Sequence, residues 1–121
     1  MPEQNGVLVV TGGSRGIGAA TARLAAARGY SVIVNYAGNA AAAEAVCAAI
    51  HADGGAAVAV RGDVSDPADV EHIFAAADRL GPLTGLVNNA GIVAPKARVE
   101  DMDVARLARM FAVNITGSFL C

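Results

Sequence analysis

One stretch near the N-terminus decides the fold, and it reads Thr11-Gly12-Gly13-Ser14-Arg15-Gly16-Ile17-Gly18. It follows the apolar run Val7-Leu8-Val9-Val10 and opens an alanine-rich segment, so a strand, a glycine turn and a helix are predicted in that order. The first turn of a helix exposes unpaired N–H groups and about half a positive charge. Glycines let an anion approach the backbone without a Cβ in the way. The stretch therefore predicts a binding site for the pyrophosphate of a nucleotide.

The residues after the last glycine argue against a second kind of phosphate loop. Nucleoside-triphosphate hydrolases place Lys and then Ser or Thr directly after that glycine, where the side chains serve the phosphates and Mg²⁺. Here Ala19 and Ala20 follow Gly18. A hydrolase of that class is therefore not expected.

Composition indicates one folded domain. The 121 residues are enough for a compact domain, and 55% hydrophobic with 17% charged residues is typical of a globular chain. The net charge of −2 argues against nucleic-acid or anionic-membrane partners. No apolar run approaches the ~20 residues that a membrane span needs. The start, Met1-Pro2-Glu3-Gln4, lacks the basic and apolar regions of a signal peptide.

The cysteines and histidines predict no metal site. Cys47 and Cys121 lack the spacing of metal ligands, and two unpaired cysteines fit a reducing cytoplasm. His51 and His72 fall in separate helical stretches, and we expect both on the solvated surface. A cytoplasmic protein without a bound metal is therefore expected.

Apolar runs and helical patterns alternate along the chain. Strands are expected at residues 7–10, 31–35, 57–61 and 85–88, each continuously apolar, as in strands buried on both faces of a parallel sheet. Helices are expected at about 17–28 and 40–51, from Asp66-Pro67 onward, and from about Asp103 onward. The last helix would carry its apolar residues on one side: Val104, Leu107, Ala108, Phe111 and Ile115. This order predicts an α/β fold, a Rossmann-type doubly wound parallel sheet of which about four strands are present.

Four motifs in one order resemble the N-terminal half of a short-chain dehydrogenase/reductase. They are the glycine stretch 11–18, Asp63-Val64, Asn88-Asn89-Ala90-Gly91, and Asn114 within Val113-Asn114-Ile115-Thr116-Gly117. The resemblance covers essentially the whole chain, and is nearest to 3-oxoacyl-carrier-protein reductases and sugar or polyol dehydrogenases. It implies a dinucleotide-binding domain at residues 1–121, hydride transfer between a nicotinamide and a carbonyl or alcohol carbon, and a homo-oligomer, a tetramer or a dimer.

The resemblance assigns cofactor contacts to the first two motifs. Three glycines permit the turn: Gly12, Gly16 and Gly18. The amides near Ser14 and Ile17 would face the pyrophosphate. Asp63 ends its strand at the carboxyl edge of the sheet, where ligands sit, and its carboxylate would accept from the adenine amino group beside the Val64 backbone. Without the other motifs, Asp63 would also be consistent with a loop cap before the helix.

The other two motifs receive roles at the ribose and at the proton relay. The resemblance places Ala90 and Gly91, with Asn89, against the cofactor ribose, and gives Asn88 the task of tying neighbouring strands together. A buried Asn114 inside an apolar helical face would need hydrogen-bond partners. In the family this Asn perturbs the helix and holds a water of the proton relay, so Asn114 is the one candidate catalytic residue. The structural alternative is an amide satisfied by local backbone.

The end of the second strand favours NADP over NAD. An NAD site usually has an acid there that pairs with the ribose 2′-hydroxyl. This chain continues Asn35-Tyr36-Ala37, which places Asn35 and Tyr36 at the adenosine end, and the next acid is Glu44. Arg15 can offer its guanidinium to a 2′-phosphate, although a solvated surface charge is the alternative. Family members often carry a second basic residue where Ala37 stands, so the preference rests on Arg15.

The Tyr-x-x-x-Lys pair that supplies the proton in this family is not found in the 121 residues. The tyrosines are Tyr30 and Tyr36, and the one lysine is Lys96. We therefore expect the N-terminal part of a longer enzyme, which by itself turns over no substrate and leaves strand 85–88 as an apolar edge.

Two other functions remain as alternatives. One is a sensor or scaffold that binds NADP(H) without catalysis. The other is a methyltransferase that uses S-adenosylmethionine, disfavoured by the wide Thr11-to-Gly18 spacing and by the Asn88-to-Gly91 motif.

Overall fold

The computed structural model describes residues 5–121, and the first four residues, which the signal-peptide prediction concerns, lie outside the description. Four strands form one parallel sheet in the order β3-β2-β1-β4. Their bounds are β1 Val7–Val10, β2 Ser31–Tyr36, β3 Ala56–Arg61 and β4 Leu83–Val87. The predicted doubly wound, Rossmann-type α/β fold is confirmed, with strand ends within two residues of the predicted ones.

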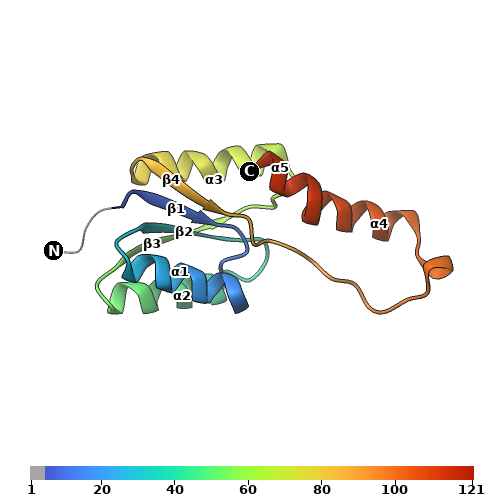
Figure 1. Cartoon of the computed structure of the whole chain (residues 1–121), viewed down its shortest axis with the longest axis horizontal. Coiled ribbons are helices and arrows are strands. Elements are labelled where there is room, and N and C mark those ends of the chain that lie inside the picture. The colour runs from blue at the N-terminus through green and yellow to red at the C-terminus, as the bar shows by residue number, and fades with distance from the viewer. Residues whose placement is uncertain (1–4) are drawn as a thin grey trace.

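Helices cover both faces of the sheet (Figure 1). Helices α1, Gly16–Ala27, and α2, Ala40–Ala52, pack on one face, where alanines and valines allow close approach to β1 and β2. Helix α3, Pro67–Leu80, covers the other face through Ile73 and Ala77. Asp66 caps α3 as predicted, because its carboxylate accepts from the Ala68 N–H at 2.9 Å.

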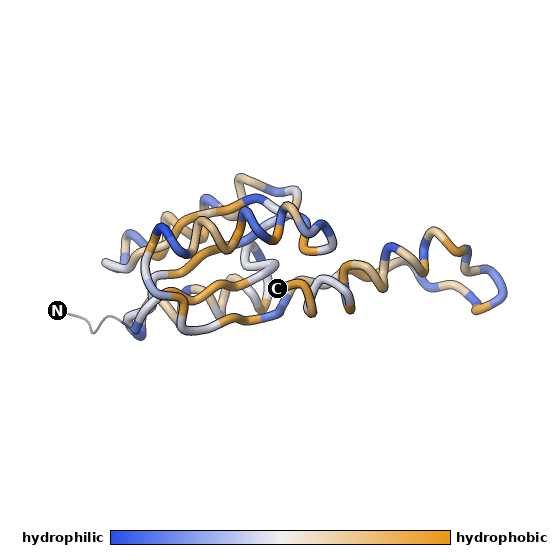
Figure 2. Tube along the Cα trace, turned by 90° about the horizontal axis from the view of Figure 1, so that it is seen from above, coloured by the Kyte–Doolittle hydropathy of each residue, from blue (hydrophilic) through white to orange (hydrophobic). Residues whose placement is uncertain are grey.

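Burial follows the position of each strand in the sheet. The central strands β1 and β2 are buried on both faces. Figure 2 shows the hydropathy of the chain, with hydrophobic segments running through the part that holds the sheet. The prediction of full burial is wrong for β3 and β4, which form the two edges, whereas the expectation that strand 85–88 forms an edge is confirmed. An edge strand lacks one neighbour, so Val58 and Leu83 remain 43% and 42% exposed.

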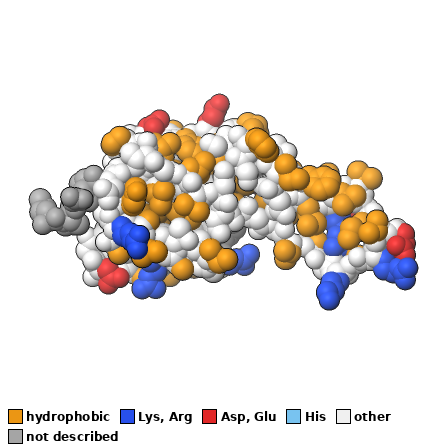
Figure 3. Space-filling view, in the orientation of Figure 1, with side chains coloured by type: hydrophobic (Ala, Val, Ile, Leu, Met, Phe, Trp, Pro, Cys, Tyr) orange, Lys and Arg blue, Asp and Glu red, His pale blue; other side chains and the backbone are white. Residues whose placement is uncertain are grey.

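After β4 the chain extends away from the sheet as far as α4 and returns beside it at α5 (Figure 1). A short 3₁₀ turn, Val99–Asp101, precedes α4, Val104–Phe111, and α5 spans Gly117–Leu120. The helix predicted from about Asp103 begins there, and a π-helical turn at Ala112–Thr116 separates α4 from α5. Hydrophobic side chains gather on this extension, among them Val104 at 81% and Phe111 at 56% exposure (Figure 3).

Further features of the described residues, 5–121, concern membrane spans, metal ligands, cysteines and histidines. No helix in this range is long and apolar enough to cross a membrane. No group of three or more potential metal ligands occurs in it. Both cysteines are free, and burial raises the pKa of each thiol. His51 and His72 are exposed as predicted, and the His51 ring also contacts the Ala57 carbonyl at 3.0 Å.

Candidate functional site

A cavity of about 610 Å³ opens at the carboxyl edge of the sheet. The chain runs from β1 outward to β2 and β3, and then returns to place β4 on the other side of β1. Such a reversal opens a crevice beyond the strand ends, where α/β sheets bind their ligands. The lining contains every predicted cofactor residue except Gly18: Gly12, Ser14, Arg15, Gly16, Ile17, Asn35, Tyr36, Asp63, Val64, Asn89, Ala90 and Gly91.

The glycine turn presents an uncapped helix end to this cavity. Helix α1 begins at Gly16, and no side chain caps its first turn. Gly16 has φ +55°, and a Cβ built on it would meet no heavy atom within 4 Å. The next residue, Ile17, is 80% exposed although it is apolar. Open space, free amides and an uncovered apolar side chain fit a ligand with an anionic group.

Gly18 differs from the prediction, because it does not line the cavity. A Cβ at this position would lie 2.2 Å from the Gly12 carbonyl oxygen and 2.5 Å from Nδ2 of Asn89. The residue therefore permits close packing of α1 on the glycine turn. Its effect on a nucleotide is indirect.

The Asn35 side chain links the glycine turn to the end of β3. Its side chain, 2% exposed, donates to the Val60 and Gly62 carbonyls at 3.2 and 3.1 Å and accepts from the Gly12 N–H at 3.2 Å. The predicted cofactor residue thus has all its polar side-chain atoms bound to backbone. The neighbouring Tyr36 is half-buried and borders the cavity.

A second set of hydrogen bonds joins the ends of β1 and β4. The buried Thr11 hydroxyl accepts from the Asn89 and Ala90 N–H groups, both at 3.0 Å. Nδ2 of Asn89 donates to the Thr11 and Gly12 carbonyls at 3.1 and 2.9 Å. The strand-tying role expected of Asn88 therefore falls to Asn89, whereas Asn88 donates to the Ser118 carbonyl at 3.2 Å. Sequence reasoning gave Thr11 no role of its own.

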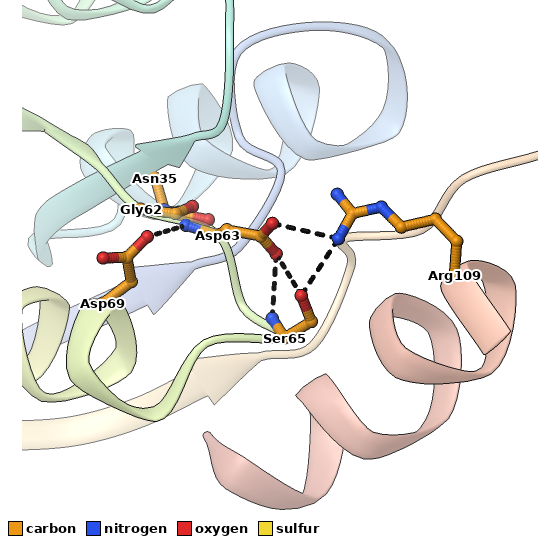
Figure 4. Close-up of polar contacts among 6 residues, drawn as sticks. All are labelled: Asn35, Gly62, Asp63, Ser65, Asp69 and Arg109. Atoms are coloured by element: carbon orange, nitrogen blue, oxygen red, sulfur yellow. Dashed lines mark hydrogen bonds and ion pairs between the residues drawn. The ribbon is translucent and has the colours of Figure 1, made fainter. Parts of the chain in front are cut away.

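Asp63 lines the cavity, and its carboxylate is held from two sides (Figure 4). Oδ1 accepts from the Ser65 N–H at 2.9 Å and from the Ser65 hydroxyl at 2.6 Å. Oδ2 accepts from Nη1 of Arg109 at 3.0 Å. The Ser65 hydroxyl, and to a smaller degree Arg109, lower the pKa of Asp63 although partial burial opposes them, so the carboxylate is ionised at neutral pH.

Asn114 joins the loop after β4 to the helical extension. Its side chain accepts from the Ile92 N–H at 2.7 Å and donates to the Ile92 carbonyl at 2.9 Å. The helix is perturbed here as expected, because Asn114 lies in the π-helical turn. The expectation of a buried amide is wrong, since the residue is exposed and its backbone partner is 22 positions away. It borders Gly91 but not the cavity itself.

Comparison with known proteins assigns the family. Residues 6–121 match the family model described as short chain dehydrogenase. The chain belongs to the short-chain dehydrogenases. It is 47% identical over 116 residues to the uncharacterized oxidoreductase YgfF of Escherichia coli, covering 95% of this chain and 47% of that protein. It is 42% identical over 120 residues to a 3-oxoacyl-[acyl-carrier-protein] reductase of Synechocystis, covering 95% of this chain and 47% of that protein.

A solved structure agrees with this assignment. The short-chain dehydrogenase/reductase from Serratia marcescens BCRC 10948 is 39% identical, with a TM-score of 0.91 over 99% of this chain and 49% of that one. The chain therefore spans about half the length of the short-chain dehydrogenases it matches. The chain thus belongs to a family of oxidoreductases that use a nicotinamide cofactor.

One charged residue of the cavity lining was not predicted from the sequence. Arg109 lies on α4, and its side chain crosses from the extension to the loop after β3. In the sequence it has the pattern of a solvated charge on an amphipathic helix. Its contact with Asp63, 46 positions earlier, depends on where α4 lies, which no local pattern encodes.

Proposed function

We propose that the protein binds NADP(H) in this cavity and serves hydride transfer with a small carbonyl or alcohol substrate, of the 3-oxoacyl-thioester, ketone, sugar or polyol class. One observation carries the proposal: the uncapped start of α1 and the ends of β1, β3 and β4 border the same cavity. The bound nicotinamide would supply or accept the hydride.

The lining residues divide the cavity by chemistry. The N–H groups at Gly16 and Ile17 suit a pyrophosphate, because they lie in the first turn of α1, which has no side-chain cap. The ionised Asp63 suits an amino donor such as that of adenine. Ala90 and Gly91, which follow β4, have no large side chains, so a ribose can approach their backbone. Asn114 fixes the loop that follows them, and we propose that it arranges a water near the reacting carbon.

The charges of the lining favour NADP(H) over NAD(H). The end of β2 and the segment after it contribute five lining residues, 35–39, and none of them is acidic. Asp63 is the one carboxylate among the lining residues, against two guanidinium groups, Arg15 and Arg109. A 2′-phosphate at the end of β2 would therefore meet Arg15 and no repelling acid.

Replacing Arg15 with Glu should weaken NADPH far more than NADH, because the new repulsion acts on the 2′-phosphate. We expect the ratio of the two dissociation constants to change at least about tenfold, which corresponds to about 1.4 kcal/mol. Calorimetric titration with both coenzymes measures it. Arg23→Glu on the exposed side of α1 is the matched control and should leave the ratio unchanged. Equal losses for NADPH and NADH in Arg15→Glu would contradict the proposed subsite.

Further elements of the proposal concern the surroundings of the site. We propose a cytoplasmic homo-oligomer, in keeping with the two free cysteines and the exposed apolar side chains of α4. The tyrosines of this chain lie beside β2, Tyr30 against the α1–α2 core and Tyr36 at the cavity, which suits neither for proton transfer beyond the end of β4. We therefore propose that residues 1–121 provide nucleotide binding and do not by themselves complete the catalytic group.

A further inference from the structure

Arg109 is a charged cavity residue to which the proposed function assigns no contact of its own. Helix α4 makes its contacts mainly with the following π-helical turn and extends away from the sheet (Figure 1). The Arg109 side chain nevertheless returns to the loop after β3, where Nη1 donates to Oδ2 of Asp63 at 3.0 Å and to the Ser65 hydroxyl at 3.1 Å (Figure 4). One nitrogen thus joins two acceptors beside the cavity.

The ion pair between Arg109 and Asp63 adds little to the stability of the fold. The side chains of Arg109 and Asp63 are 51% and 34% exposed. Exposed ion pairs contribute little to folding, because water screens the charges and two long side chains must be ordered. The structural effect of the contact is to fix the direction of the carboxylate and to bring a cation to the cavity wall.

The hydrogen bonds of Asp63 leave one acceptor position open. Oδ1 accepts from the Ser65 N–H and from the Ser65 hydroxyl, so both of its lone pairs are occupied. Oδ2 accepts from Arg109 alone among the described residues, which leaves one lone pair of Oδ2 available. The carboxylate is therefore held at three points with a single remaining acceptor, on the oxygen that Arg109 orients.

We propose that Arg109 is a positioning residue that makes Asp63 select an adenine ring by its exocyclic amino group. The inference rests on the proposed nucleotide function and deepens it. With Oδ2 held by Arg109, the free lone pair can accept one N–H donor. Adenine carries such a donor, whereas hypoxanthine carries a carbonyl oxygen in its place, which the carboxylate would repel. Without Arg109 the carboxylate can turn about its Ser65 bonds, and the discrimination falls.

The test compares NADPH with its hypoxanthine analogue, nicotinamide hypoxanthine dinucleotide phosphate, in calorimetric titrations of the protein. The wild type should prefer NADPH. Arg109→Met should lower the affinity for NADPH about tenfold, the size expected for a weakened hydrogen bond to a charged group, and change the analogue much less. Arg109→Lys should restore part of the preference, because an ammonium can reach Oδ2 but does not reproduce the bridge to Ser65.

Two controls separate this role from a structural one. Arg106→Met removes a neighbouring charge on α4 that contacts the Pro95 carbonyl and not Asp63, and it should alter neither affinity. In an Asp63→Asn background, Arg109→Met should have little further effect, because the two residues act through one contact. Circular dichroism checks that each variant is folded.

The outcomes also separate this inference from the proposed function. Equal losses for NADPH and the analogue in Arg109→Met would overturn the positioning role and indicate that the Arg109–Asp63 contact is only structural. An unchanged preference would overturn it as well. A wild type that binds neither coenzyme would instead contradict the proposed function itself.

Discussion

Replacing Gly18 with alanine is expected to lower the free energy of unfolding by about 3 kcal/mol, the combined size of an overpacked contact and a lost hydrogen bond. The added Cβ would lie 2.2 Å from the Gly12 carbonyl oxygen, which is backbone and cannot swing aside. It would also lie 2.5 Å from Nδ2 of Asn89, whose hydrogen bonds join β4 to the glycine turn. Chemical denaturation of wild type and variant measures the difference.

Gly38→Ala is the matched control for this substitution. Gly38 borders the cavity, and unlike at Gly18 a Cβ there meets nothing within 4 Å; its φ lies outside the left-handed region. Its effect should stay within about 0.5 kcal/mol, as for an ordinary surface change. A Gly18→Ala variant as stable as the wild type would show that α1 and the glycine turn do not pack as closely as described.

Replacing Gly16 with valine is expected to abolish coenzyme binding while the fold persists. The Cβ of residue 16 points into open space at the cavity, so the new side chain would occupy the position of the ligand instead of clashing with the protein. The backbone there has φ +55°, which costs a branched side chain about 1–2 kcal/mol. Calorimetric titration with NADPH should show no saturable binding, and circular dichroism should show the helices intact.

The control must carry the same backbone strain away from the cavity. Gly54→Val meets this need, because Gly54 has φ +85°, has open space at its Cβ, and lies in the turn between α2 and β3. It should lose stability and keep its affinity for NADPH. Equal affinity in Gly16→Val and Gly54→Val would mean that the glycine turn is not the phosphate site.

Local patterns predicted most of the fold because each element is encoded within its own residues. The apolar run 7–10, the glycines after it and the capping Asp66 specify a strand, a turn and a helix without reference to distant parts. Burial of β3 and β4 was predicted wrongly for the opposite reason. Whether a strand has one neighbour or two depends on the order β3-β2-β1-β4, which composition alone does not contain.

The candidate site divides in the same way. Twelve predicted residues line the cavity, since glycine turns and strand ends meet at one edge of any parallel sheet. Their individual tasks were harder to predict. Asn35 and Asn89 bind backbone from other segments, Asn114 holds a loop while remaining exposed, and Arg109 enters the site from α4. Each of these contacts spans more than 20 positions and exists only once the chain is folded.

Nucleotide binding is tested most directly by a calorimetric titration of the wild-type protein with NADPH and, separately, with NADH. We expect one saturable site for NADPH, weaker binding of NADH, and competition by 2′,5′-ADP, which carries the adenosine end and its 2′-phosphate alone. No saturable binding of either coenzyme would contradict the proposed function, and so would NADPH binding that 2′,5′-ADP does not displace.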